Sequence, residues 1–277
     1  MKTTLRNNTL AGLTLALMTW LVGMPSASAV ITTFQSGVGS AYAGLTDTYT
    51  EYQSGYQNYN WGGYNKSLIY NKGGGSEKVA LLNLALTSMA PSVSVNSATL
   101  SLTFAGLAER TGGFSQTYEA YAILRSGLNF GTGAPAIQNG TVSFSASSYD
   151  PTTPTGWGSS NTGTNGPVAG QDYSNILLGS FALTSANVNE SVVSFSLNSS
   201  TVASWINTPL SNYGFVIVSV ADALHDQAQF YSAQENQVYA PRLVIDTTAI
   251  PEPGTAALLG LGTVMMLQRF RRGRKIA

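Results

Sequence analysis

Hydrophobic and hydroxyl residues alternate along much of this chain, and such a two-residue period is typical of strands that are buried on one face. The clearest example is residues 98–104, where Ala, Leu, Leu and Phe alternate with Thr and Ser. Residues 79–86 form a largely apolar run of strand length. The same reasoning predicts further strands at residues 118–125, 141–145, 175–183, 192–197, 215–220, 229–232 and 242–246.

One segment has the period of a helix instead. Val202, Trp205 and Ile206 are spaced as i, i+3 and i+4, Asn198 precedes them as a helix cap, and Pro209 ends the pattern. Many short strands with one short helix predict an all-β fold, an antiparallel β-sandwich of jelly-roll type. Residues 147–172, rich in Gly, Pro, Ser and Thr, are predicted to form a long loop.

Both ends of the chain have the composition of targeting segments, which leaves residues 30–249 as one β-sandwich domain. Residues 1–29 have a positively charged start, an apolar stretch predicted to be a signal helix, and a small-residue cleavage site at Ala27 and Ala29. Residues 250–277 contain an apolar run, predicted to be a hydrophobic helix, between a Pro-Glu-Pro motif and a basic end. The motif and basic residues are Pro251, Glu252, Pro253, Arg269, Arg271 and Arg272.

Residues 250–277 resemble a PEP-CTERM sorting signal in the Pro-Glu-Pro motif, in the order of motif, apolar run and basic end, and in their position at the C-terminus. The resemblance implies processing by an exosortase in the inner membrane of a Gram-negative bacterium. It also implies that the chain is exported to the cell surface or extracellular matrix and is only transiently anchored in the inner membrane. Contact with the membrane would then be made only through the terminal segments. The alternative interpretation is an ordinary membrane anchor followed by a positively charged stop.

The composition of the chain argues against some classes of binding partner. Charged residues make up only 9% of the chain, against about 25% in ordinary soluble proteins. Residues 30–249 contain six basic and twelve acidic residues, a formal net charge of −6. Such a domain does not suit nucleic acid, which is bound by clustered Lys and Arg. The chain has no cysteine, so disulfides and thiolate metal sites are excluded.

Several short motifs of the domain resemble those of disaggregatase-related (DNRLRE-type) domains. They are found at residues 46–49 (TDTY), 58–62 (NYNWG), 78–86 (KVALLNLAL), 97–100 (SATL), 201–205 (TVASW), 212–215 (NYGF) and 241–243 (PRL). The resemblance implies an extracellular jelly-roll module related to carbohydrate-binding modules, some of which bind acidic polysaccharide. Two segments depart from the family pattern, Asn83-Leu84 and Ser232-Ala233-Gln234, and the second departure weakens any site placed on that strand.

Aromatic residues in polar, loop-like sequence are candidates for carbohydrate binding, because apolar sugar faces stack on Tyr and Trp rings. The alternative is that these rings cap the edge of the sandwich or fill its core. Trp205, on the apolar face of the predicted helix, is expected to pack. The carbohydrate candidates are Tyr52, Tyr56, Tyr59, Trp61, Tyr64 and Trp157.

Calcium is the ion that best suits an exported, acidic domain, since it binds carboxylate and carbonyl oxygens. The candidate ligands are Asp47, Asp222, Asp226 and Glu235. No Asp-x-Asp-x-Asp loop is present, and solvated surface carboxylates are the alternative.

The sequence does not favour catalysis. His225 is the only histidine, and no Gly-x-Ser-x-Gly motif occurs, which argues against a serine hydrolase. We therefore expect a non-enzymatic protein of the cell surface or biofilm matrix that binds extracellular polysaccharide without turnover. A polysaccharide hydrolase or lyase and a structural surface protein without a specific ligand are the alternatives. The candidates for the two catalytic carboxylates of a polysaccharide hydrolase are Glu109, Glu119, Asp150 and Asp172.

Overall fold

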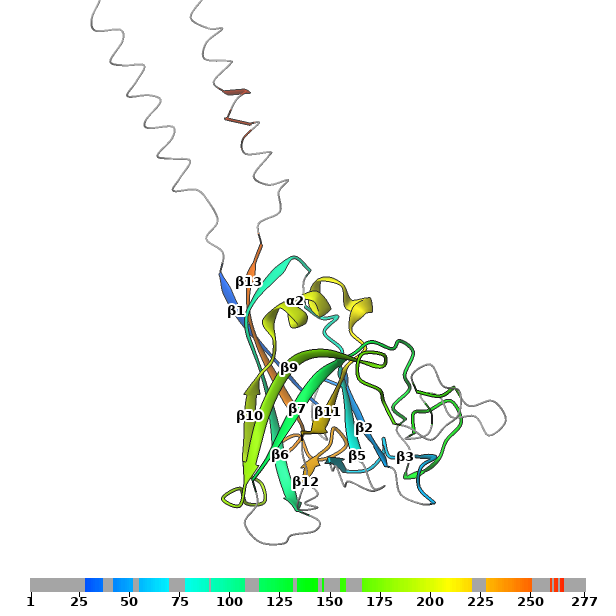
Figure 1. Cartoon of the computed structure of the whole chain (residues 1–277). Coiled ribbons are helices and arrows are strands. Elements are labelled where there is room, and N and C mark those ends of the chain that lie inside the picture. The colour runs from blue at the N-terminus through cyan, green and yellow to red at the C-terminus, as the bar shows by residue number, and fades with distance from the viewer. Residues whose placement is uncertain are drawn as a thin grey trace, which may run out of the picture. The chain divides into compact units, whose positions relative to one another are not determined.

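The structure is a computed structural model of the chain (Figure 1). It describes residues 28–36, 42–51, 55–69, 78–89, 91–107, 115–131, 134–143, 146, 155–157, 166–220, 228–250, 260, 262–263 and 265–266. Its contacts divide the chain into two compact units, residues 1–29 with 248–277, and residues 30–247. The sheets and their cores belong to the second unit.

Two sheets make up most of this unit, and the fold is all-β with one α-helix among the described residues of this unit, as the sequence predicts. The first sheet has the order β1, β13, β6, β12, β4, with β10 also paired to β6. Its strands are β1 (Ala29–Gln35), β4 (Lys66–Ile69), β6 (Val93–Leu107), β10 (Val192–Ser196), β12 (Ala228–Tyr231) and β13 (Arg242–Ala249).

The second sheet has the order β2, β5, β11, β7, β9. Its strands are β2 (Leu45–Glu51), β5 (Lys78–Leu84), β7 (Ser115–Ile123), β9 (Tyr173–Thr184) and β11 (Phe215–Ser219). Neighbouring strands run antiparallel, as in β2 with β5 and β11 with β7. A small third sheet pairs β3 (Tyr59–Asn60) with β8 (Ala136–Ile137).

Side chains of the two large sheets meet in one main core. The ring of Phe230 on β12 lies 5.6 Å from Phe181 on β9 and 6.5 Å from Tyr118 on β7, measured between centroids. The alternation predicted at residues 98–104 falls inside β6, where Leu100 and Leu102 are fully buried. The hydrophobic residues of the alternating strands therefore face one another across the sheets.

The predicted helix is α2 (Ser199–Asn207), and its cap is Asn198, whose side-chain oxygen accepts a hydrogen bond from the Thr201 amide at 3.0 Å. Val202, Trp205 and Ile206 are buried, as predicted from their spacing. The Trp205 ring stacks on Phe215 of β11 at 6.5 Å, so Trp205 has the packing role expected of it. A short 3-10 turn, Pro209–Ser211, follows the helix.

A second core lies on the opposite face of the second sheet. Leu81 and Val216 of this sheet pack there with Phe130, Val142 and Trp157 from the connection between β7 and β9. Residues 141–143 are not strand in the structure, so the strand predicted at 141–145 is wrong in its described part. The apolar residues that produced this prediction instead pack a connecting segment onto the sheet.

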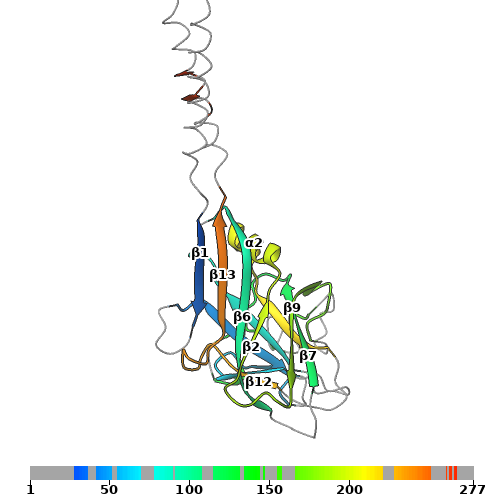
Figure 2. The same ribbon diagram turned by 90° about the vertical axis from the view of Figure 1, so that its left-hand side faces the viewer.

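The chain enters and leaves the second unit at adjacent positions. The Thr247 hydroxyl donates to the Val30 carbonyl at 3.3 Å, and Nε2 of the Gln35 side chain donates to the Ala240 carbonyl at 3.2 Å. Strands β1 and β13 are therefore antiparallel neighbours, as Figure 2 shows.

Most of the predicted terminal helices lies outside the described residues, and so does Ala27. Ala29 is the first residue of β1, and Gly260, Gly262, Thr263, Met265 and Met266 are helical. Among the described residues, no helix combines the length and the apolar character that a membrane span requires. The secretory signal at residues 1–29 and the sorting signal at 250–277 remain predictions.

Candidate functional site

Five aromatic rings gather where the edge strands β2 and β4 approach each other, and Trp61 lies at their centre. Its ring centroid is 4.8 Å from Tyr49, 5.9 Å from Tyr64, 6.0 Å from Tyr56 and 6.1 Å from Tyr59. Tyr49 stacks on the indole, whereas Tyr64 meets it edge-on. We call these five residues the Trp61 cluster.

Local hydrogen bonds hold the segment that carries this cluster. The Trp61 amide donates to Thr48 Oγ1 on β2 at 3.2 Å. Gln234 Nε2 donates to the Gly62 carbonyl at 3.0 Å, and Ser232 Oγ donates to the Tyr64 carbonyl at 2.8 Å. The connection between β3 and β4 is thereby fixed to both large sheets, and the rings that it carries have fixed positions.

The side chain of Asn60 also holds this segment in place through hydrogen bonds. Its side-chain nitrogen donates to the carbonyls of Phe130 and Val142, both at 2.9 Å, and its oxygen accepts from the Gly62 amide at 3.0 Å. A Cβ at Gly62 would lie 2.1 Å from the Phe130 carbonyl oxygen, so only glycine fits there.

Exposure separates the rings into a base and a surface. Tyr49 is 2% exposed and Tyr56 is 41% exposed, while Tyr59, Trp61 and Tyr64 are half-buried. Trp61 Nε1 is buried, and no described atom is its hydrogen-bond partner. Tyr49 therefore forms the buried base, and Tyr56, with the exposed parts of Tyr59, Trp61 and Tyr64, can be reached by a ligand.

A buried ion pair lies beside this base. Lys78 Nζ is 2.8 Å from Glu51 Oε1, and the two side chains are only 8% and 4% exposed. They face each other because β2 and β5 pair Glu51 with Lys78. The ammonium also lies 6.0 Å from the Tyr49 ring centroid, and burial raises the pKa of the Tyr49 hydroxyl, which stays neutral.

Asp47 joins the edges of the two sheets. Its carboxylate accepts hydrogen bonds from the Ser67 hydroxyl on β4 and from the Ala233 amide, the latter at 2.8 Å. Burial raises the pKa of Asp47 to about 6, and the two hydrogen bonds oppose only part of this increase.

This buried carboxyl should make stability depend on pH. Because the pKa of Asp47 is higher in the folded than in the unfolded chain, its contribution is largest below its unfolded pKa and is lost as the pH rises through about 6. The free energy of unfolding of wild type relative to Asp47→Asn should fall by roughly 2 kcal/mol between about pH 4.5 and 7. Urea unfolding of both proteins across that range measures it, and a difference that does not vary with pH would contradict the assignment.

The calcium candidates are not assembled into a site by the described residues. Asp47 is buried and hydrogen-bonded, and Glu235 Oε2 accepts from the Asn65 side chain at 3.1 Å. Asp222 and Asp226 lie outside the described residues, as does His225. Within the described part of the chain, no group of three or more His, Cys, Asp or Glu residues could hold a metal ion. Calcium binding remains a prediction.

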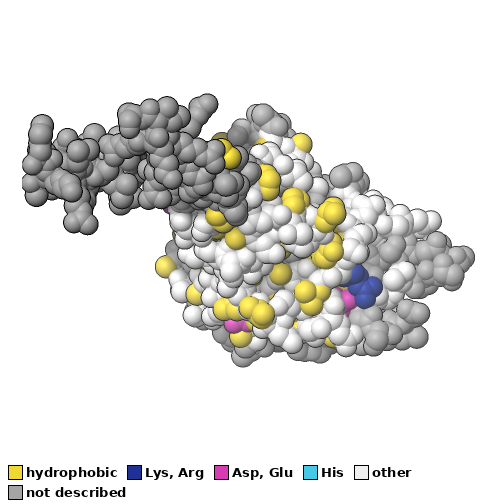
Figure 3. Space-filling model, turned by 90° about the horizontal axis from the view of Figure 1, so that it is seen from above, with side chains coloured by type: hydrophobic (Ala, Val, Ile, Leu, Met, Phe, Trp, Pro, Cys, Tyr) yellow, Lys and Arg dark blue, Asp and Glu magenta, His cyan; other side chains and the backbone are white. Residues whose placement is uncertain are grey.

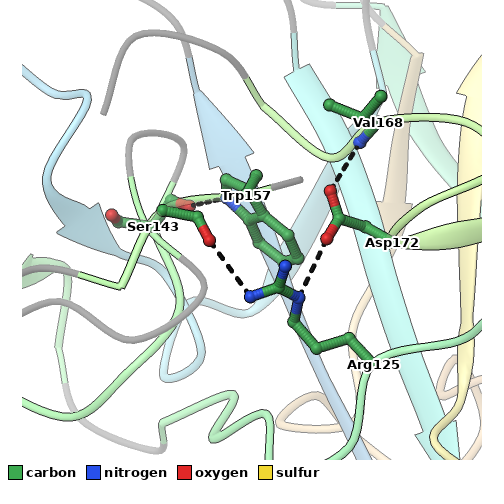
Figure 4. A network of polar contacts seen from close by, with 6 residues as sticks. Arg125, Ser143, Trp157, Val168 and Asp172 are labelled. Carbon is green, nitrogen blue, oxygen red and sulfur yellow. Dashed lines mark hydrogen bonds and ion pairs between the residues drawn. The ribbon is translucent and has the colours of Figure 1, made fainter. Parts of the chain in front are cut away.

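Trp157 is separate from the Trp61 cluster, and Figure 4 shows its surroundings. It is 2% exposed, and its Nε1 donates to the Ser143 carbonyl at 2.8 Å. The Arg125 guanidinium lies 6.0 Å from its ring centroid and forms an ion pair with Asp172 at 2.8 Å. Asp172 also accepts from the Val168 amide at 2.9 Å. Trp157 thus has no exposed ring face for a sugar, and we leave it out of the site.

Of the carboxylates proposed for catalysis, the two that the structure describes have separate partners. Asp172 is the partner of Arg125, and Glu119 accepts a hydrogen bond from the Tyr121 hydroxyl. Glu109 and Asp150 lie outside the described residues.

Four of the six aromatic candidates therefore lie in one cluster, and Tyr52 lies outside the described residues. The sequence analysis missed Tyr49 as their base and missed the ion pair beside it. Alternation of Asp47, Tyr49 and Glu51 on one face of β2 is the signal that could have indicated both.

Comparison with models of known protein families finds no match, and comparison with curated proteins finds none either. The resemblances of the tail and of the domain motifs therefore remain predictions.

Proposed function

We propose that the domain binds extracellular polysaccharide without turnover, through the exposed rings of the Trp61 cluster. One observation supports this most strongly: Tyr56, Tyr59 and Tyr64 surround Trp61 at a fixed surface position, where Tyr56 is 41% exposed. Tyrosine rings bind the apolar faces of sugars, and nearby side-chain amides such as those of Asn65 and Gln234 can bind hydroxyls.

We also propose that the two sheets form a jelly-roll sandwich. The orders β1-β13-β6-β10 and β5-β11-β7-β9 support this, because eight strands in two sheets are what a jelly roll requires. In this arrangement β2 extends the second sheet beyond β5, and the pair β12 and β4 extends the first. An experimentally determined structure with another strand order would contradict the proposal.

Ligand binding can be tested with one surface ring. The Tyr56→Ala variant should bind its polysaccharide about fivefold more weakly, since one aromatic contact contributes about 1 kcal/mol. Folding should be little affected, because this side chain is 41% exposed. Affinity electrophoresis of the full chain in detergent micelles, in gels that contain different polysaccharides, measures the affinity.

Tyr121→Ala is the matched control. Tyr121 is a half-buried tyrosine whose ring contacts that of Tyr173, but it lies on β7, which β5 and β11 separate from β2. Equal loss of affinity in the two variants would contradict a site at the Trp61 cluster. Release of reducing or unsaturated ends from a bound polysaccharide would favour the hydrolase or lyase.

We further propose that the protein is exported to the surface or extracellular matrix of a Gram-negative bacterium, with residues 250–277 as an exosortase-processed signal. The Pro-Glu-Pro motif ahead of an apolar run and a basic end supports this. In a host that contains an exosortase, replacement of Pro251, Glu252 and Pro253 by Ala should make the unprocessed chain accumulate in the inner membrane. Immunoblots of membrane fractions measure it, and unchanged processing would contradict the proposal.

A further inference from the structure

The cations of the domain are few, and those described near the Trp61 cluster already have partners. Lys78 is bound within the buried pair with Glu51, and Lys66 Nζ is 3.4 Å from the Gln229 side-chain oxygen. Arg125 is paired with Asp172 beside Trp157, away from the cluster. Lys72 and Arg110 lie outside the described residues, and Arg242 is on β13. No array of basic side chains therefore surrounds the rings in the part of the chain that the structure describes.

Carboxylates near the cluster add negative charge. The Glu235 carboxylate accepts a hydrogen bond from Asn65, the residue that follows Tyr64. The Asp47 carboxylate on β2 accepts one from Ser67 on β4. The domain as a whole has twelve acidic and six basic residues between positions 30 and 249. On the face shown in Figure 3, Lys and Arg atoms occupy one small area beside an acidic side chain, and most of the described surface is uncharged.

An acidic polysaccharide repeats a carboxylate or sulfate along its length, and such a chain is recognised by Arg and Lys side chains that form charge-assisted hydrogen bonds. Near an acidic surface the same groups are repelled, and like charges brought together weaken binding. A neutral polysaccharide does not require Arg or Lys side chains, and an acidic surface does not repel it. It needs only aromatic faces and uncharged hydrogen-bonding groups, and the Trp61 cluster has both.

We infer that the ligand of the Trp61 cluster is a neutral polysaccharide rather than an acidic one. This inference rests on the proposed glycan-binding function and specifies its ligand class. Sugar rings would lie against Tyr56, Tyr59 and Tyr64, and the amides of Asn65 and Gln234 would bind hydroxyl groups. Because no ion pair with the ligand is involved, affinity should change less than about twofold when salt is raised, since salt screens only charge interactions.

The test compares polysaccharides that share a backbone and differ in charge: hydroxyethyl cellulose with carboxymethyl cellulose, dextran with dextran sulfate, and methyl-esterified with de-esterified polygalacturonate. Affinity electrophoresis of the full chain in micelles is run at low and high sodium chloride, with Tyr56→Ala and Tyr121→Ala beside wild type. We expect retardation by at least one neutral member, weaker retardation by its charged partner, little effect of salt, and weaker binding by Tyr56→Ala alone.

Two results would overturn the inference, and they differ in what they say of the proposed function. Stronger retardation by the charged member of a pair, lost at high salt, would leave glycan binding intact and make the ligand acidic. Absence of retardation by any member, neutral or charged, would count against glycan binding itself and therefore against both proposals.

Discussion

Replacing Lys78 by Met should lower the free energy of unfolding by about 3–5 kcal/mol, because it leaves the Glu51 carboxylate buried without its partner. The Glu51 side chain is only 4% exposed, so water cannot replace the lost ammonium. Urea unfolding followed by circular dichroism measures the change. As a matched control, Lys66→Met removes the same type of side chain from a half-buried position whose partner, Gln229, is neutral, and should cost less than about 1 kcal/mol.

The double variant Lys78→Met with Glu51→Gln identifies the cause of this loss. Removing both charges removes the unpaired carboxylate, so the double variant should be more stable than Lys78→Met alone. If it is less stable than the single variant, loss of packing rather than loss of charge pairing would explain the effect, and our account of this pair would be wrong.

Replacing Trp61 by Ala should cost about 3 kcal/mol of folding stability and also abolish measurable glycan binding. The ring contacts four others, so its removal leaves a cavity and frees the tyrosines around it. Circular dichroism during urea unfolding gives the stability, and affinity electrophoresis below the unfolding transition gives the binding.

The Trp61→Phe variant distinguishes the contribution of ring packing from that of the indole N–H. Trp61 Nε1 is buried and has no hydrogen-bond partner among the described residues, so the smaller ring breaks no described hydrogen bond and keeps most of the packing. We expect a loss of less than about 1 kcal/mol and retention of most of the binding. Equal loss of stability in Trp61→Ala and Trp61→Phe would contradict the packing role of this ring.

Local patterns in the sequence predicted much of the fold. The α2 helix and its Asn198 cap follow from signals within a dozen residues, and β6 follows from alternation between residues 98 and 104. Strand β2 was missed because its buried side chains include Asp47, Thr48, Thr50 and Glu51, which have the polar composition of a surface. Only pairing with β5 shows that Lys78 neutralises Glu51, and the sequence does not reveal that register.

The candidate site was predicted in part for a similar reason. Tyr56, Tyr59, Trp61 and Tyr64 are close in the sequence, so a short connection is enough to bring them together. Trp157 has the same polar, loop-like sequence context, but its connection packs against the outer face of the second sheet and buries the ring. Local composition does not distinguish a loop that faces solvent from one that covers a sheet.

Hydrogen–deuterium exchange of the full chain, with and without the neutral polysaccharide that binds most tightly, tests most directly whether the Trp61 cluster is the binding site. Bound ligand should slow amide exchange in peptides that cover residues 55–65, with little change in those that cover residues 166–184. The Tyr56→Ala variant should show weaker protection at the same ligand concentration. Protection confined to another segment, or binding without any slowing of exchange at residues 55–65, would contradict the account.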